Sequence, residues 1–175
     1  MKRIASVKSH RLFFALWPDG ATSQSLLRLQ SGVRGRKTHR DDFHITLAFL
    51  GERPADLLPA LKEILAGLGR PEMTLVLDRL GYFRHNRIAW VGMGTPPPAL
   101  FQLHDTLLRE LTNRSISLSA YGDFRPHITL ARNADAPAEQ PFAPITWLAC
   151  RLVLAESMPA FDGARYRLLA EVLPA

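Results

Sequence analysis

The stretch FHITLAFLG at residues 43–51 decides the fold of this chain, because its central pentamer HITLA returns unchanged at residues 127–131. A segment repeated within a short chain indicates two related structural halves. Each copy is rich in apolar and β-branched residues and is typical of a β-strand. We therefore expect two pseudo-symmetric lobes, each with one copy of the pentamer on a strand, packed about an approximate twofold axis with a cleft between them.

The repeated pentamer places two polar side chains on one face of each strand. In a strand, residues i and i+2 point to the same side, so His44 shares a face with Thr46, and His127 shares a face with Thr129. The isoleucine and leucine of each copy point the other way, into the protein. The approximate symmetry then predicts that the two His-Thr pairs face each other across the cleft.

Two histidines at one site are suited to acid–base catalysis on a phosphoester. The unperturbed pKa of histidine is about 6.5, so a neutral imidazole and an imidazolium coexist near neutral pH. One can take a proton from the attacking oxygen while the other gives a proton to the leaving oxygen. The threonine hydroxyls can donate to phosphoryl oxygens, and Arg132, just after the second copy, can supply positive charge. The residues thus predict a phosphoryl site but do not name its substrate.

The rest of the sequence predicts an α+β fold with mostly antiparallel sheets and flanking helices. Strand-like segments follow one another through short turns, and leucines recur at helical spacing between them. The expected strands are residues 11–17, 43–51, 73–83, 87–93, 115–119, 125–132, 145–156 and 164–173, and the expected helices are residues 19–31, 55–68 and 100–111.

The composition describes one globular domain with a basic surface. The 175 residues are 47% hydrophobic and include one cysteine, Cys150, which excludes an internal disulfide and a cysteine-based metal site. No apolar run reaches the length of about 20 residues that a membrane span needs, so we expect a cytoplasmic protein with no membrane partner. Lys and Arg number 22 against 16 Asp and Glu, a net charge of +6, which favours a polyanion such as nucleic acid as the partner.

The two motifs also resemble those of a known family. FHITLAFLG and RPHITLAR (residues 125–132) resemble the paired H-x-T-x motifs of the two-histidine (2H) phosphoesterase superfamily, and more narrowly the bacterial RNA 2′,3′-cyclic phosphodiesterases, also called 2′-5′ RNA ligases. Three further stretches resemble that family, namely RLFFALWP at residues 11–18, GYFRHNRIAWVG at residues 81–92 and ARYRLLAEVLP at residues 164–174. The resemblance implies a single bilobal domain over residues 11–175, preceded by a basic N-terminal extension, residues 1–10, to which we assign no role.

The resemblance implies hydrolysis of RNA or nucleoside 2′,3′-cyclic phosphate ends to a 2′-phosphate, with the 3′-oxygen expelled. By the same resemblance, His44 is the proton donor to that oxygen and His127 the proton acceptor that activates water, while Thr46, Thr129 and Arg132 bind the phosphate. Attack by an RNA hydroxyl on the cyclic phosphate is the corresponding ATP-independent 2′-5′ ligation. This mechanism requires no metal and no other cofactor, and we expect the chain to act as a monomer.

Further contacts with the base or the RNA backbone are expected around the motifs, because aromatic rings stack on bases and basic side chains contact phosphates. The candidates are Phe13, Phe14 and Tyr166 for stacking, and Arg34, Arg36, Lys37 and Arg40 of an exposed basic loop at residues 32–40 for the backbone. His10 is expected on the surface.

Two other classes of function stay open at this point. A metal-dependent phosphohydrolase could draw its ligands from His39, Asp41, Asp42, His44, Asp123 and His127, although none of the usual ligand spacings is present. A non-catalytic RNA-binding module on the same fold would keep the basic loop and the aromatic residues but would not need both His-Thr pairs. A third alternative keeps the chemistry and changes the substrate, since related two-histidine enzymes act on other cyclic phosphates, such as ADP-ribose cyclic phosphate or tRNA-splicing intermediates. Hydrolysis of a cyclic nucleotide in excess EDTA separates the metal-dependent enzyme from the two-histidine one.

Overall fold

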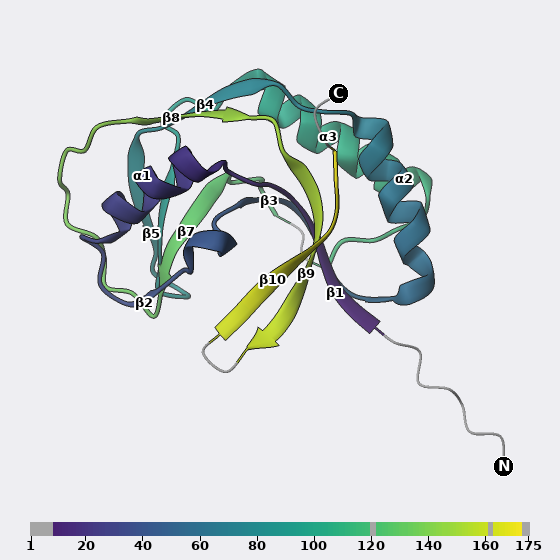
Figure 1. The fold of residues 1–175 in the computed structure, drawn as a ribbon, viewed down its shortest axis with the longest axis horizontal. Coiled ribbons are helices and arrows are strands. Elements are labelled where there is room, and N and C mark those ends of the chain that lie inside the picture. The colour runs from purple at the N-terminus through teal and green to yellow at the C-terminus, as the bar shows by residue number, and fades with distance from the viewer. Residues whose placement is uncertain (1–8, 120–121, 161–162, 173–175) are drawn as a thin grey trace, which may run out of the picture.

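A computed structural model describes residues 9–119, 122–160 and 163–172, which form a mixed fold of helices and strands (Figure 1). The helices are α1 (Gly20–Gln30), α2 (Leu58–Leu68) and α3 (Pro98–Asn113), with short 3-10 helices η1 (Arg40–Asp42) and η2 (Ala55–Leu57). The strands are β1 (Ser9–Leu16), β2 (Arg36–Lys37), β3 (Ile45–Pro54), β4 (Met73–Leu77), β5 (Arg79–Phe83), β6 (Ile88–Gly92), β7 (His127–Arg132), β8 (Ile145–Ala149), β9 (Leu152–Ala160) and β10 (Gly163–Glu171).

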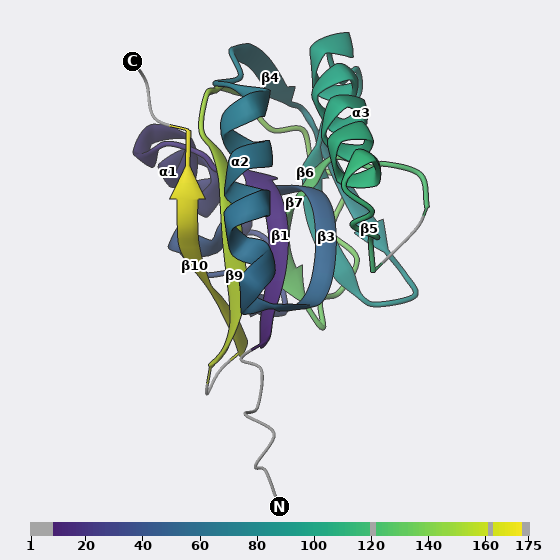
Figure 2. The same cartoon turned by 90° about the vertical axis from the view of Figure 1, so that its right-hand side faces the viewer.

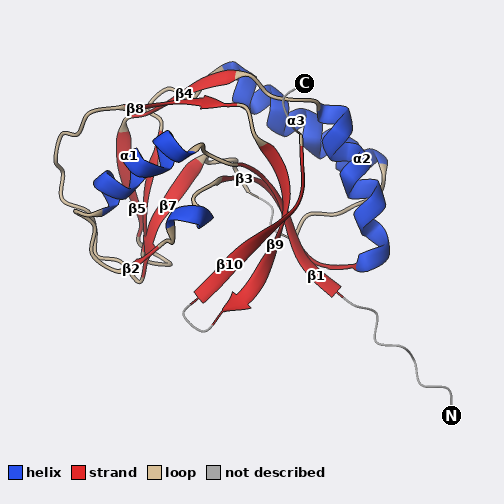
Figure 3. Ribbon diagram, in the orientation of Figure 1, coloured by secondary structure: helices blue, strands red, loops and turns tan. Residues whose placement is uncertain are grey.

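The described strands form one large sheet and one small one, and all their pairings are antiparallel. The large sheet has the order β10-β9-β1-β3-β7-β6-β5 with β2 added on β7, whereas β4 and β8 pair separately. Within the described ranges β3 and β7 pair at one position, Ile45 with Ile128. The large sheet therefore consists of two half-sheets, which Figure 3 shows as two groups of strands around the centre of the molecule. The predicted α+β fold with antiparallel sheets is confirmed, and the half-sheets are its two lobes.

Alternation along β1 separates the main core from the face that carries the site. Leu12, Phe14 and Leu16 are fully buried in the main core, together with the apolar stripes of α2 and α3. Figure 2 shows these two helices lying in front of the large sheet. Phe13 and Ala15 belong to a second, smaller cluster on the other side of the strand, as the period of two along a strand requires. That smaller cluster forms the floor beneath the functional residues.

Two of the predicted strands are each divided in the structure. Residues 73–83 form β4 and β5, which separate at Asp78, where the carboxylate Oδ1 accepts a hydrogen bond of 2.7 Å from the backbone N–H of Gly94. Residues 145–156 likewise form β8 and the first part of β9. The reason is a change of partner: β4 pairs with β8, whereas β5 pairs with β6 and β9 with β1 and β10. The apolar sequence of each segment gives no sign of where the strand changes its pairing partner.

The predicted strand at residues 115–119 is wrong. Ser115 has a φ of 57°, in the left-handed region, and lies just after Arg114, the residue that caps the C-terminal end of α3. Residues 115–119 belong to none of the strands that pair in the described parts of the chain. The chain thus leaves the helix through a turn rather than entering a sheet.

The N-terminal boundary also differs from the prediction. β1 begins at Ser9, so that His10 lies in the sheet rather than in the extension, and its side chain is buried instead of exposed. His10 Nδ1 lies 2.6 Å from a carboxylate oxygen of Glu156 in β9, which gives the buried imidazole a partner. Residues 1–8 of the predicted extension lie outside the described residues. No helix in the described ranges is long and apolar enough to cross a membrane.

Candidate active site

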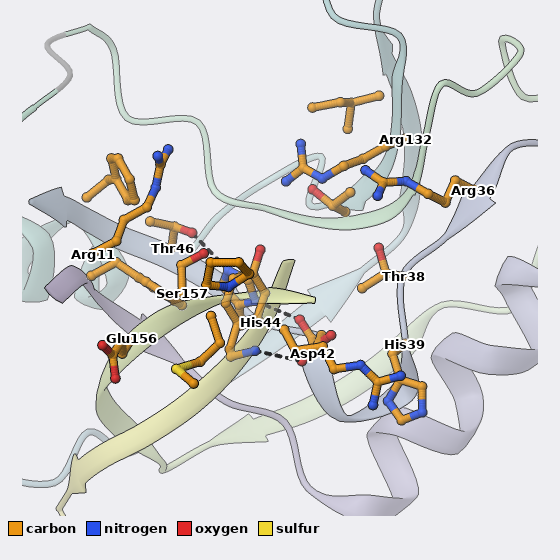
Figure 4. A pocket seen from close by; sticks show the side chains of 18 of the residues that line it. Arg11, Arg36, Thr38, His39, Asp42, His44, Thr46, Arg132, Glu156 and Ser157 are labelled. Atoms are coloured by element: carbon orange, nitrogen blue, oxygen red, sulfur yellow. Dashed lines mark hydrogen bonds between the residues drawn. The ribbon is translucent and has the colours of Figure 1, made fainter. Parts of the chain in front are cut away.

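A cleft of about 1030 Å³ opens where the two half-sheets meet, and both copies of the repeated motif line it (Figure 4). The structure brings together there all five residues expected to act on the phosphate. These are His44, Thr46, His127, Thr129 and Arg132. Residues from β1, β2, β6, β9, β10, the distal part of β3 and the segment between β2 and β3 complete the walls.

The pairing of β3 with β7 explains how the two motifs come together. The two strands run antiparallel and pair at Ile45 and Ile128, the isoleucines of the two pentamers, and both isoleucines are buried. An antiparallel pair has a local twofold axis, and here that axis passes through the repeated sequence itself. The two His-Thr pairs are therefore related by that axis and open into the same cleft.

Both imidazole rings are oriented by a backbone carbonyl two residues earlier in the chain. His44 Nδ1 donates to the carbonyl oxygen of Asp42 at 2.7 Å, and His127 Nδ1 donates to that of Arg125 at 2.6 Å. Because a carbonyl can only accept, Nδ1 carries the proton in the neutral form of each ring, and Nε2 is left with its lone pair. His44 Nε2 lies 3.1 Å from the hydroxyl of Thr46. In each motif Nε2 is therefore the atom that can exchange a proton with a substrate.

Aromatic rings surround His44, whose side chain is half-buried in the wall of the cleft. Trp17 stacks on the imidazole with ring centroids 5.1 Å apart and an interplanar angle of 9°, and the rings of Phe13 and Tyr166 approach to 5.1 and 4.9 Å. Burial lowers the pKa of His44 from 6.5 to about 4, although the hydrogen bond to Asp42 opposes the shift. The free protein thus holds His44 as a neutral imidazole at neutral pH.

His127 lies in a similar but more open surrounding. Phe83 meets its ring edge-on at 5.0 Å, and the indole of Trp90 lies 6.0 Å away. Burial lowers the pKa of His127, and the positive charge of Arg132 lowers it further, while the hydrogen bond to Arg125 acts against both. Both shifts thus favour the neutral imidazole in the free protein.

Asp42 supports the first motif twice, although the phosphoesterase hypothesis gave it no role. Its carbonyl accepts from His44, and its buried carboxylate accepts a hydrogen bond of 3.3 Å from the backbone N–H of Tyr166 in β10. Burial raises the pKa of the carboxyl group, while that hydrogen bond lowers it. The i−2 spacing of the carbonyl was a usable local signal, whereas the contact with β10 was not visible in the sequence.

Gln30 ties the second motif to the segment that carries the basic residues. Its side-chain Nε2 donates to the backbone carbonyls of Thr38 at 2.8 Å and Leu130 at 2.7 Å, and the side chain is buried. Thr38 itself lines the cleft. A helix residue thus holds the β2 segment in place against β7.

Part of the predicted basic loop is an edge strand that reaches the cleft. β2 pairs with β7 so that Arg36 lies opposite Arg132, and both side chains line the cleft, as does Lys37. Like charges directly opposite each other in a sheet are unfavourable, and a bound anion would relieve that repulsion. Arg34 and Arg40 are not among the residues that line the cleft.

The three aromatic candidates for base stacking have different positions. The prediction for Phe14 is wrong, since its side chain is fully buried in the main core on the far side of β1. Phe13 lies on the cleft side, but its ring is 2% exposed beneath His44 and Tyr166, which leaves no free face for a base. Tyr166 is partly exposed and lines the cleft.

The six residues considered as metal ligands do not form a single cluster. His39, Asp42 and the two motif histidines line the cleft, but Asp41 and Asp123 do not. Over the part of the chain that the structure describes, no three His, Cys, Asp or Glu side chains form a group that could hold a metal ion.

An antiparallel bilobal fold with two His-x-Thr pairs in one cleft defines the chain as a two-histidine phosphoesterase. Comparison with family models agrees and names a narrower group: the model of the 2′-5′ RNA ligase superfamily matches residues 18–157. The chain belongs to that superfamily.

Individual relatives agree in sequence and in structure. The RNA 2′,3′-cyclic phosphodiesterase of Escherichia coli (strain K12) is 34% identical over 141 residues, which cover 78% of this chain and 80% of that protein. A solved phosphoesterase structure superposes with a TM-score of 0.84 at 30% identity, covering 94% of this chain and 97% of the other. The crystal structure of E. coli LigT complexed with 3′-AMP superposes with a TM-score of 0.80 at 30% identity, with the same coverage.

Proposed function

We propose that this chain is an RNA 2′,3′-cyclic phosphodiesterase, which hydrolyses a 2′,3′-cyclic phosphate at an RNA end or on a nucleotide to a 2′-phosphate. The observation that carries the proposal is the pair of symmetry-related histidines, each with Nδ1 held by a carbonyl and Nε2 available in one cleft. Acid–base catalysis of a displacement at phosphorus needs two such groups. The activity named for the E. coli relative is the same.

In the proposed reaction, His127 Nε2 takes a proton from water as the water oxygen attacks phosphorus. The bond between phosphorus and the 3′-oxygen breaks, and His44 Nε2 gives its proton to that oxygen. The products are the 2′-phosphate and a free 3′-hydroxyl, with the proton now on His127 instead of His44. When an RNA 5′-hydroxyl replaces water, the same steps form a 2′-5′ linkage without ATP.

The negative charge of the phosphate is met by groups from both motifs. Thr46 and Thr129 can donate hydroxyl hydrogen bonds to the non-bridging oxygens, and Arg132 supplies a positive charge that stabilises the transition state. Arg36 and Lys37 extend this positive region along β2, where they add to the attraction of the cleft for the phosphate.

Substrate binding also adjusts the proton affinity of the histidines. In the free protein burial lowers the pKa of both histidines. The pKa of the proton donor must therefore rise before that histidine is protonated at neutral pH. A bound phosphate anion favours an imidazolium beside it and raises its pKa. The cleft thus favours protonation of the donor when substrate is present. Since one chain supplies both histidines, we propose a monomer as the active form, with one bilobal catalytic domain.

Product analysis on a short RNA that ends in a 2′,3′-cyclic phosphate tests the proposal. We expect a 2′-phosphate as the product, in the presence or absence of excess EDTA. A 3′-phosphate product would contradict the proposed reaction. Activity that is lost in EDTA and restored by added metal would favour the metal-dependent alternative.

A further inference from the structure

The far end of the cleft carries a cationic surface, formed by Arg11 and Phe49, that the proposed chemistry does not use. Arg11 of β1 lies over the ring of Phe49 in β3, with its guanidinium carbon 4.9 Å from the ring centroid, and both residues line the cleft. Arg11 is exposed and, within the described ranges, makes no ion pair. Its cross-strand neighbour Glu52 instead accepts a hydrogen bond from Ser9 at 3.0 Å. A guanidinium held over an aromatic ring by a cation–π contact can itself stack on a nucleotide base.

This surface lies beyond the reacting groups but on the same floor. Phe13 packs beneath His44 with ring centroids 5.1 Å apart and pairs with Phe49 across the strands. Arg11 is two residues from Phe13 on the same strand, a step of about 6.8 Å. In Figure 4, Arg11 lies on one side of His44 and Arg132 on the other. A ligand that reaches both must extend beyond the phosphate.

The charges at the two ends indicate which part of a ligand lies where. Arg36, Lys37 and Arg132 line one end of the cleft, so the cyclic phosphate is attracted to that end. The Arg11 end also has two carboxylates. The charge of Glu156 is balanced by its ion pair with Arg167, whereas Glu52 makes no ion pair within the described ranges and so disfavours a phosphate. The Glu156 carboxylate is held in place by hydrogen bonds from His10 at 2.6 Å and Arg167 at 2.5 Å. The Arg11 end is therefore suited to a neutral flat group rather than to an anion.

We propose that Arg11 and Phe49 form a stacking subsite for the base of the nucleotide next to the one that bears the cyclic phosphate. The inference rests on the proposed function, and it narrows the substrate class to oligonucleotide ends over mononucleotides. The cyclic phosphate occupies the 2′- and 3′-oxygens, so the neighbouring nucleotide can only be attached through the 5′-oxygen. The cleft of about 1030 Å³ is at the upper limit of pockets that hold one drug-sized ligand, which leaves room for a second base.

Three substrates separate the stacking subsite from a second phosphate site. They are adenosine 2′,3′-cyclic phosphate, the dinucleotide ApA ending in a 2′,3′-cyclic phosphate, and the same dinucleotide with its first nucleotide abasic. The abasic compound keeps the added phosphate and lacks only the base. For the wild type we expect a KM for the full dinucleotide about 5- to 150-fold lower than for the abasic one, the range that stacking of one base produces. Equal KM values for these two dinucleotides would overturn the inference.

Two variants assign that difference to the named residues. Arg11→Gln and Phe49→Leu are each expected to remove most of the KM difference between the full and the abasic dinucleotide. The control is Arg109→Gln, on the exposed side of α3 and away from the cleft. It removes the same charge and is expected to leave the KM difference between the two dinucleotides unchanged. If Arg11→Gln instead raises the KM of all three substrates equally, the residue acts on charge alone and the inference is wrong. Hydrolysis of the mononucleotide by the wild type supports the proposed function in either case, so the two failures are distinguishable.

Discussion

A methyl group added at Gly81 tests whether the packing behind His127 is needed for activity. Gly81 of β5 lies opposite Trp90 of β6, and the indole lies over the glycine. A Cβ built on Gly81 would come within 3.0 Å of indole carbons Cζ2, Cε2 and Cη2, closer than real Cβ contacts come. Trp90 must therefore move, and it packs between Phe83, at 5.2 Å, and His127, at 6.0 Å.

The expected effects of Gly81→Ala are on both stability and rate. Overpacking of this kind costs about 1–3 kcal/mol of unfolding free energy, which for a chain of this size lowers Tm by about 2–12 °C. Displacement of Trp90 removes packing from His127, and a shift of about 1 Å in a catalytic group can cost about 100-fold in rate. We therefore expect a lower Tm and a fall in kcat for a nucleoside 2′,3′-cyclic phosphate that exceeds any change in KM.

The matched control is Gly67→Ala in α2, where an added Cβ meets nothing within 4 Å. Alanine in a helix interior is favoured over glycine by about 0.5–1 kcal/mol, so this variant is expected to melt slightly higher with unchanged kinetics. Thermal denaturation and steady-state hydrolysis on the three proteins provide the comparison. A Gly81→Ala protein with the Tm and kcat of the wild type would refute the argument that the indole cannot yield and that His127 depends on it.

Three further outcomes follow from the site. His44→Ala and His127→Ala are each expected to reduce kcat by about 10²–10⁴-fold with Tm near that of the wild type, and near-normal turnover in either variant would contradict the mechanism. With a pKa of about 4, His44 is protonated in about one free molecule in a thousand at pH 7, and His127 also has a lowered pKa. Log kcat/KM should thus fall by about one per pH unit above pH 6.5, where both rings are neutral, and a flat profile from pH 6.5 to 8.5 would exclude this. Burial alone would raise the pKa of Glu156, but hydrogen bonds from His10 and Arg167 lower it. Since the folded-state pKa is the lower one, this stabilisation is present above the unfolded value of about 4.3 and is lost as the pH falls through the folded value. Glu156→Gln should therefore lose about 1.5–3 kcal/mol at pH 7 and show a weaker acid dependence in denaturant titrations, and an unchanged dependence would be evidence against the pairing.

The parts of the site that were predictable are those set by short-range geometry. The face shared by His44 and Thr46 follows from the period of two in a strand, and the carbonyl that orients each histidine lies two residues earlier in the chain. The repeated sequence also indicated the approximate twofold relation, because identical strands pair most simply about such an axis. These features needed no knowledge of which strand neighbours which.

The errors at Phe14, at His10 and within residues 73–83 have a common cause: each depends on which distant segment packs against or pairs with the residue. Phe13 and Phe14 are equivalent in sequence, and only the packing of α2 and α3 on one side of β1 decides which of them enters the main core. His10 was expected on the surface because Glu156, which buries it, lies 146 positions away. The division of residues 73–83 at Asp78 likewise depends on β8, a strand much later in the chain.

By itself, the sequence determined that this chain has two related halves, each with an imidazole and a hydroxyl on one face of a strand, and therefore what class of chemistry it can perform. Tertiary structure decided every feature that depends on contacts between residues far apart in sequence. The single pairing of Ile45 with Ile128 brings the two histidines into one cleft, the stacked ring of Trp17 contributes to the burial that lowers the pKa of His44, and the β1–β3 register places Arg11 near Phe49. Side-chain alternation is a local property of the backbone, whereas burial and charge at a site are set by side chains from segments far apart in sequence.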